Sequence, residues 1–237
     1  SQDLKNPHAQ LANLDFIDRW MLNELNKAVK RFNEELENYR PDSAFNHLYQ
    51  FVWYEFCDWY LEFFKVKKEN APAKLESSQQ VLCYCLDTIL KLLHPMAPMV
   101  TERIYSELPW ADKGKLLLQS FPVARNEAIA SPQDLSAIAA LKSSVEGIRN
   151  FRTENKISPK QMIPAYLQTD HIQLWKEIAT FTLSLAKIYR LEVNSTPSGG
   201  LSGKVATAEF TFTLPLEGLV DKEAEKSRLQ NEIKKVR

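Results

Sequence analysis

Hydrophobic residues recur at helical spacing through the first part of the chain. Between Leu14 and Tyr39 they return every three or four positions, and charged residues fall between them. This pattern predicts one amphipathic helix that ends before Pro41. Glycine is absent before Gly114, which also favours helices in this part of the chain. Three more helices are expected, beginning near Asp42 or Ser43, after the Ala71-Pro72 break, and at Pro98.

The second predicted helix is unusually aromatic. Because its apolar residues follow steps of three and four, core packing is favoured for Phe56 and Trp59. It is favoured less for Phe51 and Tyr54, which fall off this stripe. The alternative is that exposed rings stack on unpaired RNA bases, which contributes about 1 to 3 kcal/mol per base. The stripe consists of Phe45, Leu48, Tyr49, Val52, Phe56, Trp59, Tyr60 and Phe63.

The pattern changes around Trp110. The run from Leu116 to Phe121 is interpreted as a strand. Ser131 is expected to cap a helix, because a proline follows at the first helical position and Asp134 lies three residues on.

Further strands are expected toward the C-terminus. Residues 162–168 and 187–193 are interpreted as extended, and Asp170 as the cap of a helix between them. From Ala206 to Leu214 apolar and polar residues alternate strictly, which is typical of a strand with one wet face. The segment from Ser195 to Lys204 is rich in Gly, Ser and Pro and is predicted to be mobile.

These elements predict a mainly α fold, with an antiparallel helical bundle followed by a small α+β domain. The bundle is assigned to residues 1–110 and the α+β domain to 111–218, in the order strand, helix, strand, helix, strand, strand. Residues 219–237 are dense in charge, with apolar residues at i, i+4 and i+7. This pattern is interpreted as the start of a coiled-coil helix.

Composition narrows the classes of function. The 237 residues carry 30 Lys and Arg against 30 Asp and Glu, so no global excess of positive charge indicates a polyanion partner. The apolar stretches are too short to cross a bilayer, and no membrane partner is expected. Three cysteines and scattered histidines do not form a metal-ligand pattern, so no metal site is expected. So few cysteines favour a reducing compartment, interpreted as the cytoplasm.

The strongest local group of basic residues lies on and after the helix that begins at Ser131. Helical steps keep most of these residues on one side, and only Glu146 and Glu154 interrupt them. They are predicted to bind RNA phosphates. The alternative is that the arginines offset the negative end of their own helix, which contributes about 0.3 to 1 kcal/mol each. The predicted RNA-binding residues are Lys142, Arg149, Arg152, Lys156 and Lys160.

No motif of an established catalytic site occurs in the sequence. Phosphate-binding glycine loops, nucleophile elbows and zinc-protease motifs are all missing, and no catalytic residue is assigned. Two alternative functions stay open. A helical protein-protein interaction module would bind its partner with little dependence on salt. An enzyme of another chemistry would gather carboxylates such as Glu55, Asp58 and Glu102 in a cleft.

Several segments resemble valyl-tRNA synthetases, a family of class I aminoacyl-tRNA synthetases. The run FVWYEFCDWYLEF at 51–63 is similar to the W-x-E-F-C-D-W-Y segment of this family, and KLLHPMAPMVTERIYSELPW at 91–110 is similar to the segment after it. Further similarity lies in DRWMLNELN at 18–26, GIRNFRTENKISP at 147–159 and LPLEGLVDKEAE at 214–225.

The resemblance implies a tRNA-binding fragment from the anticodon side of such a synthetase, with tRNA(Val) as partner. Such a chain supports the attachment of valine to tRNA without a catalytic or editing site of its own. ATP would bind to the catalytic domain, so no cofactor is expected in this chain, and a monomer is expected. The family's first bundle helix, with an Arg-Asn-aromatic motif, would precede Ser1.

Overall fold

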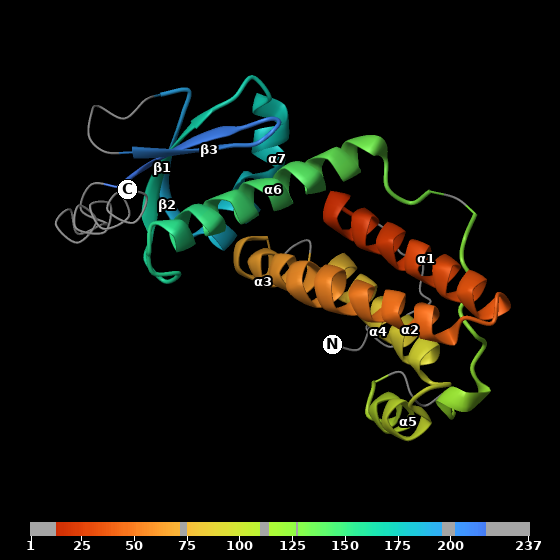
Figure 1. Cartoon of the computed structure of the whole chain (residues 1–237). Helices are drawn as coiled ribbons and strands as arrows, with labels where there is room; N and C mark the ends of the chain where they lie inside the picture. Colours follow the sequence, from red (N-terminus) through yellow and green to blue (C-terminus); the bar gives the residue numbers. More distant parts are fainter. Residues whose placement is uncertain (1–12, 72–74, 110–113, 127, 196–201, 217–237) are drawn as a thin grey trace, which may run out of the picture. The chain divides into compact units, whose positions relative to one another are not determined.

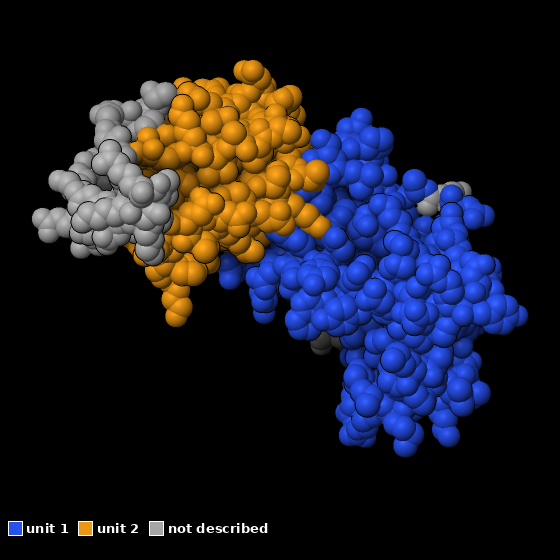
Figure 2. All heavy atoms as spheres, in the orientation of Figure 1, with its two compact units in different colours: residues 1–138 blue, residues 139–237 orange. Residues whose placement is uncertain are grey.

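The computed structural model describes residues 13–71, 75–109, 114–126, 128–195 and 202–216. The chain divides into two compact units, 1–138 and 139–237, which Figure 2 colours separately. The first unit is built of helices and the second adds a four-stranded sheet, which confirms the predicted mainly α fold with a small α+β region. No helix in the described ranges combines the length and apolar character that crossing a membrane requires.

The first unit begins with α1, Phe16–Glu37, which lies beside α2 and α4 (Figure 1). Its N-terminus is capped by the Asp15 carboxylate, which accepts hydrogen bonds from the N–H groups of Ile17 and Asp18 at 3.1 and 3.0 Å. In the predicted stripe of this helix, Ile17, Met21, Leu25 and Phe32 are buried, and Ala28 and Leu36 are half-buried. Helices α4, Leu75–Leu93, and α5, Pro98–Ser106, confirm the two other helices expected in this region.

The second predicted helix is continuous but changes its winding twice. It consists of α2, Pro41–Gln50, a π-helical segment η2, Phe51–Tyr60, and α3, Leu61–Asn70. Pro41 is its first residue, and the preceding Arg40 makes no side-chain cap, so the expected caps at Asp42 and Ser43 are wrong. Successive buried residues are Ala44, Leu48, Phe51, Phe56, Tyr60 and Phe63.

The buried stripe differs from the predicted one because it contains one step of five residues, from Phe51 to Phe56. A π-helix needs more residues per turn than an α-helix, so it shifts which residues face the core. Phe51 is therefore buried, whereas Tyr49 lies outside the core. The π-helical segment decides which aromatic rings reach the surface.

The strand predicted at 116–121 is wrong. Leu116–Leu118 form a short 3-10 helix, and the Glu102 carboxylate on α5 accepts the N–H groups of Leu116 and Leu117 at 3.0 and 3.3 Å. Because a side chain binds these N–H groups, they do not form a strand ladder.

The segment after this 3-10 helix packs along α1. Asn33 donates to the carbonyl oxygen of Pro122, and Asn26 exchanges two hydrogen bonds with the backbone of Arg125. The two compact units divide at residue 138. The domain limits at 110 and 218 stay predictions.

Helix α6, Pro132–Glu154, begins where the sequence predicts. The Ser131 hydroxyl accepts the Asp134 N–H at 3.2 Å, and the Asp134 carboxylate accepts the Ser131 N–H at 2.8 Å. This reciprocal pair satisfies two N–H groups at the start of the helix, with aspartate in the place that glutamate usually takes.

The second unit contains a four-stranded sheet. Strands β1, Ile163–Gln168, and β2, Ile188–Val193, are parallel and joined by helix α7, Ile172–Ala186, which confirms two predicted strands and the helix between them. The N-cap of α7 is His171 and not Asp170. The spatial order of the strands is β2-β1-β4-β3.

The predicted strand from Ala206 to Leu214 is wrong in its continuity. It contains the end of β3, Ser202–Ala206, a turn, and most of β4, Thr211–Pro215. In the turn, the N–H of Thr207 donates to the Phe210 carbonyl oxygen at 2.8 Å, and the Thr207 hydroxyl accepts the Phe210 N–H at 3.1 Å. The threonine therefore closes a hairpin, in which β3 and β4 pair antiparallel.

Two of the sequence predictions fall wholly or largely outside the described residues. These are the coiled-coil start at 219–237 and the mobile segment from Ser195 to Lys204, of which 196–201 is not described. Residues 202–204 belong to β3.

Candidate nucleic-acid interface

The five basic residues predicted to bind RNA lie in the second unit, on α6 and in the turn that follows it. Arg149, Lys156 and Lys160 are exposed, and Lys142 is half-buried. Arg152 differs from the others because only 4% of its surface is exposed. RNA contact by this group stays a prediction, and the structure assigns its members to different environments.

Arg152 is held by backbone carbonyl groups. Its Nη1 donates to the carbonyl oxygens of Ser158 and Gln161 at 3.1 and 2.8 Å. Its Nη2 donates to those of Ala186 and Lys187 at 2.9 and 3.0 Å. Burial lowers the pKa of this guanidinium. Arg152 thus joins the turn after α6 to the C-terminal end of α7, which gives its side chain a structural role.

In the first unit, an exposed row of aromatic rings lies along the helix that contains the π-helical segment. Tyr49, Trp53 and Tyr54 are 57%, 52% and 54% exposed. The rings of Tyr49 and Trp53 stack, with centroids 6.0 Å apart and planes 10° from parallel. We call these three residues the aromatic row. Phe56 is buried, as expected. Tyr49, which the sequence pattern places in the core stripe, is exposed.

A hollow of about 420 Å³ lies between α1 and this helix. Tyr54 of the aromatic row lines it, together with Lys27 and Arg31 of α1. Lys27 forms an ion pair with Glu24 at 2.8 Å, and Arg31 is exposed. An aromatic face beside cationic side chains is the combination that single-stranded nucleic acids require, because bases stack and phosphates need positive charge.

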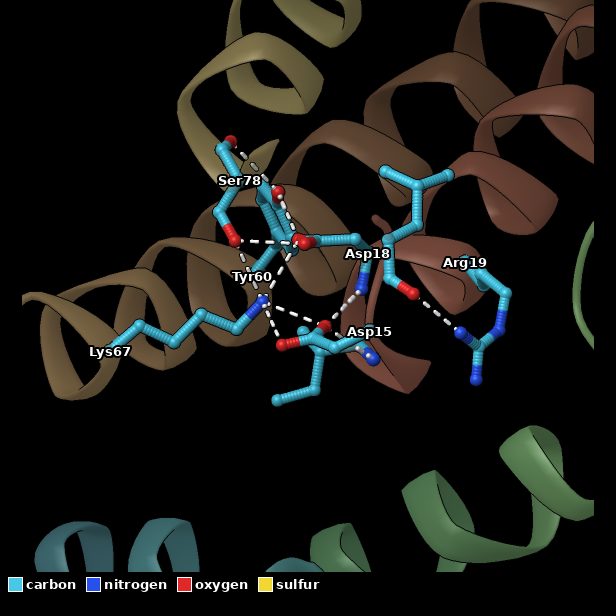
Figure 3. Close-up of polar contacts among 8 residues, drawn as sticks. Asp15, Asp18, Arg19, Tyr60, Lys67 and Ser78 are labelled. Atoms are coloured by element: carbon cyan, nitrogen blue, oxygen red, sulfur yellow. Dashed lines mark hydrogen bonds and ion pairs between the residues drawn. The ribbon is translucent and has the colours of Figure 1, made fainter. Parts of the chain in front are cut away.

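A buried polar cluster fixes the C-terminal end of the π-helical segment (Figure 3). The Lys67 ammonium, on α3, donates to Asp15 at 2.8 Å, to Asp18 at 2.9 Å and to the Ser78 hydroxyl at 2.8 Å. Tyr60, the last residue of η2, donates its hydroxyl to Asp18 at 2.9 Å. Only 2% of Lys67 is exposed and Asp18 is fully buried.

This cluster ties three helices together, because Asp15 and Asp18 belong to the start of α1 and Ser78 to α4. Burial raises the pKa of Asp18, and the Lys67 ammonium opposes this shift. Burial also raises the pKa of Tyr60 well above its ordinary value, so its hydroxyl stays a donor. The cluster therefore holds the end of η2 in one position against α1.

Metal binding and thiol chemistry find no support among the described residues. No group of three or more His, Cys, Asp or Glu is arranged there to hold a metal ion. The three cysteines are free thiols, and burial raises the pKa of each. A raised pKa reduces the reactive thiolate, so these cysteines act as packing residues.

Sequence reasoning missed two sets of surface residues. The aromatic row was hidden because α-helical periodicity places Tyr49 in the core; only the pair Trp53-Tyr54 could have indicated a change of winding. The second set is Lys187, which follows α7, and Tyr189 of β2. Arg152 donates to the Lys187 carbonyl oxygen and so joins this segment to the end of α6. No local pattern indicates that contact.

Comparisons with known proteins identify the family of this chain. Residues 18–167 match the family described as the anticodon-binding domain of tRNA ligase. The chain is 32% identical over 236 residues to a valine–tRNA ligase from Synechocystis sp., covering 94% of this chain and 26% of the relative.

Two further relatives give the same result. A valine–tRNA ligase from Legionella pneumophila is 32% identical over 222 residues, with 90% of this chain and 24% of the relative covered. One from Corynebacterium efficiens is 34% identical over 227 residues, with 94% and 25% covered. The chain thus spans about a quarter of the length of these relatives. It belongs to the family of anticodon-binding domains of tRNA ligases, in a form similar to that of valine–tRNA ligases.

Proposed function

We propose that this chain binds tRNA(Val) through the anticodon arm, as the RNA-binding part of a valine–tRNA ligase. The observation that carries this proposal is the aromatic row beside Lys27 and Arg31 of α1. Three large rings, each more than half exposed, are costly to leave in water and are suited to bases that are not paired. An anticodon loop offers such bases.

The hollow beside Tyr54 supports base recognition over general phosphate binding. Phosphate contacts position a nucleic acid, whereas contacts to bases distinguish its sequence. The hollow offers carboxylate, amide and imidazole groups from Glu55, Gln50 and His47 next to the exposed ring. These groups can pair with the edges of a base that is stacked on the ring.

Binding is the contribution that we assign to this chain. The sequence carries no motif for amino-acid activation, and the chain matches a quarter of each relative. Valine activation by a full-length ligase would then occur outside these residues. Valine-dependent exchange of pyrophosphate into ATP by this chain alone would contradict that assignment.

The test compares Trp53→Ala with a control, Tyr39→Asn, for affinity toward tRNA(Val). Loss of a stacked base is worth about 1 to 3 kcal/mol, so Trp53→Ala should weaken binding by roughly 5- to 150-fold. Tyr39 is 92% exposed in the same unit but outside the aromatic row, and its backbone φ of 58° suits asparagine. The control should bind like the parent.

A second arm tests the sequence preference. A tRNA(Val) with another anticodon should bind the parent more weakly, and this difference should shrink in Trp53→Ala. Equal affinity of Trp53→Ala and the parent for both RNAs would overturn the proposal, as would a parent that does not distinguish tRNA(Val) from the altered RNA.

A further inference from the structure

A second surface with RNA-binding chemistry lies in the second unit, where the turn after α6 meets the turn between α7 and β2. Arg152 joins the two turns through its four carbonyl acceptors, and the Ile163 N–H adds a hydrogen bond to the Lys187 carbonyl oxygen at 3.1 Å. The exposed basic and aromatic residues of the turn after α6, of the residue after α7 and of the start of β2 are Lys156, Lys160, Lys187, Tyr189 and Arg190, here called the turn surface.

Two of its lysines occupy positions that favour glycine. Lys156 and Lys187 each follow the end of a helix with left-handed φ angles of 53° and 54°. After α6, the Lys156 N–H donates to the Thr153 carbonyl oxygen and the Ile157 N–H to that of Arg152, which is the usual glycine-ended closure of a helix. A side chain with a Cβ is disfavoured in this conformation.

The same conformation with the same residue type at both turns indicates that the side chains serve a purpose beyond closing the helices. Backbone conformations that cost free energy are frequent at functional sites. The shared residue type indicates that positive charge is needed where the two turns meet.

Tyr189 provides an independent observation. In the pairing of β1 with β2, Ile163 is opposite Ile188 and Pro164 is opposite Arg190, so Tyr189 is the extra residue of a β-bulge. Bulges redirect a side chain and are frequent beside functional sites. The ring is 62% exposed between two basic residues of the same strand region.

The charges of the turn surface are mostly of one sign. Arg190 pairs with Glu192 at 2.8 Å and remains 70% exposed, while Lys156, Lys160 and Lys187 are exposed lysines. The whole chain has no net charge, so this surface is a local excess of positive charge. A polyanion with regularly spaced charges and flat sugars or bases fits it better than an acidic peptide does, because the surface also presents an aromatic ring.

We propose that the turn surface is a second tRNA contact, in which Lys156, Lys160 and Lys187 bind backbone phosphates and Tyr189 packs against a ribose or an exposed base. This inference rests on the proposed function, because it takes tRNA as the partner. It adds a contact that is independent of the anticodon sequence. Arg152 acts as a positioning residue, which holds the two turns at the spacing that the phosphates require.

The experiment compares two double variants with equal loss of charge. Lys156→Asn with Lys187→Asn removes two charges from the turn surface, and asparagine tolerates the left-handed conformation. Lys176→Gln with Lys204→Gln removes two exposed charges elsewhere in the same unit, on α7 and β3. Affinity for tRNA(Val) and for a tRNA with another anticodon is measured from 0.05 to 0.3 M salt, together with the melting temperature.

Each phosphate contact adds about 0.9 to the slope of log affinity against log salt. The turn-surface variant should therefore lose up to about two units of slope and bind roughly 50-fold more weakly at 0.1 M salt, equally for both RNAs. Its melting temperature should not fall. The Lys176/Lys204 control should keep the slope and affinity of the parent.

A third variant, Tyr189→Ala, should weaken binding without changing the salt slope, because it removes no charge.

The outcomes separate this inference from the proposed function. If the parent binds tRNA(Val) and the two double variants bind equally, the turn surface is not a contact, while the proposed function stands. If the turn-surface variant melts at a lower temperature and binds like the parent, the lysines only stabilise the helix ends, and the inference is overturned. If the parent does not bind tRNA(Val), both proposals fail.

Discussion

Among the described residues, each unit buries one cation, and the two units satisfy it in different ways. Lys67 in the first unit lies among two carboxylates and a hydroxyl, whereas Arg152 in the second lies among four backbone carbonyl oxygens. A lysine ammonium is a compact charge that needs a counter-charge when it is buried. The planar guanidinium can instead bind several carbonyl groups at fixed angles.

The difference shows how each unit positions its candidate RNA surface. In the first unit, charge pairing between helices fixes the end of the π-helical segment (Figure 3). The aromatic row lies on the same continuous helix. In the second unit, hydrogen bonds to backbone fix two turns that carry lysines. The first arrangement depends on ionised carboxylates, and the second does not.

Lys67→Met should have the largest effect on stability. It leaves Asp15 and Asp18 without their ammonium partner, and breaking a buried pair costs about 3 to 5 kcal/mol. Lys65→Met is the matched control, because Lys65 is an exposed residue on the same helix that pairs only with Glu62 in the described structure. That control should change stability by at most about 0.5 kcal/mol.

Urea unfolding, followed by the circular dichroism of the helices, measures the effect. Adding Asp18→Asn to Lys67→Met should recover part of the loss, since it removes one uncompensated charge. A Lys67→Met protein as stable as the parent would show that the cluster does not hold the three helices together.

Arg152→Gln should have the next largest effect. A glutamine cannot reach four carbonyl groups, and hydrogen bonds from a charged donor contribute about 1.5 to 3 kcal/mol each. Water replaces some of these hydrogen bonds in the variant, so the free energy of unfolding should fall by about 2 to 3 kcal/mol. Hydrogen exchange of the β1 and α7 amides measures this change. Arg149→Gln, at an exposed position of the same helix, should change stability by less than about 0.5 kcal/mol.

The two arginine variants also separate stability from RNA binding. Arg149→Gln should weaken binding of all tRNAs alike and reduce the salt slope by up to about one unit, if the predicted phosphate contact of Arg149 holds. Arg152→Gln, studied at a temperature where it is folded, should lower both the stability and the salt slope, because it also loosens the two turns that carry the lysines of the turn surface. An Arg152→Gln protein as stable as the parent would contradict the structural role of Arg152.

The smallest expected effect on stability is that of replacing Asp134. Arg19 donates to its carboxylate through Nε at 2.9 Å and also through Nη2, and this lowers the pKa of Asp134 to about 2. Because the unfolded carboxyl titrates near pH 3.9, the stabilisation is complete above about pH 5 and is lost as the pH falls toward 2. Asp134→Asn should therefore cost about 1 to 2 kcal/mol at pH 7.

Comparing the parent with Asp134→Asn across pH tests whether the ionised Asp134 carboxylate stabilises the fold. The difference in unfolding free energy should shrink as the solution is acidified from pH 5 to 2. A difference that stays constant over this range would mean that the Asp134 charge does not contribute, and that only the helix cap does.

The sequence is sufficient to predict the elements whose ends or faces are set by residues close together in the chain. The start of α6 was predicted because Ser131 and Asp134 cap it within four residues. The stripe of α1 was predicted because its period is regular. Helices and strands whose ends depend on such neighbours can be identified from the sequence alone.

Errors arose where a side-chain hydrogen bond or a change of helix winding interrupts a regular pattern. Glu102 takes the N–H groups of the segment interpreted as a strand at 116–121, and Thr207 closes a turn inside a run of perfect alternation. The five-residue step from Phe51 to Phe56 is invisible to a search for α-helical periodicity.

The candidate site was predicted in part for the same reason. Spacing along α6 identified the group of basic residues, but the burial of Arg152 depends on carbonyl groups 34 and 35 residues away. The exposure of Tyr189 follows from a bulge between two strands. Neither fact has a local sequence signal.

We expect tRNA to contact this chain at both the aromatic row and the turn surface. Hydrogen exchange of the chain with and without tRNA(Val) tests both at once, because bound RNA slows the exchange of amides beneath it. Slower exchange should appear at residues 49–54, and at 155–161 with 187–190, while α5 and β3 stay unchanged. Protection confined to other elements, or no protection at RNA concentrations that saturate binding, would contradict the account.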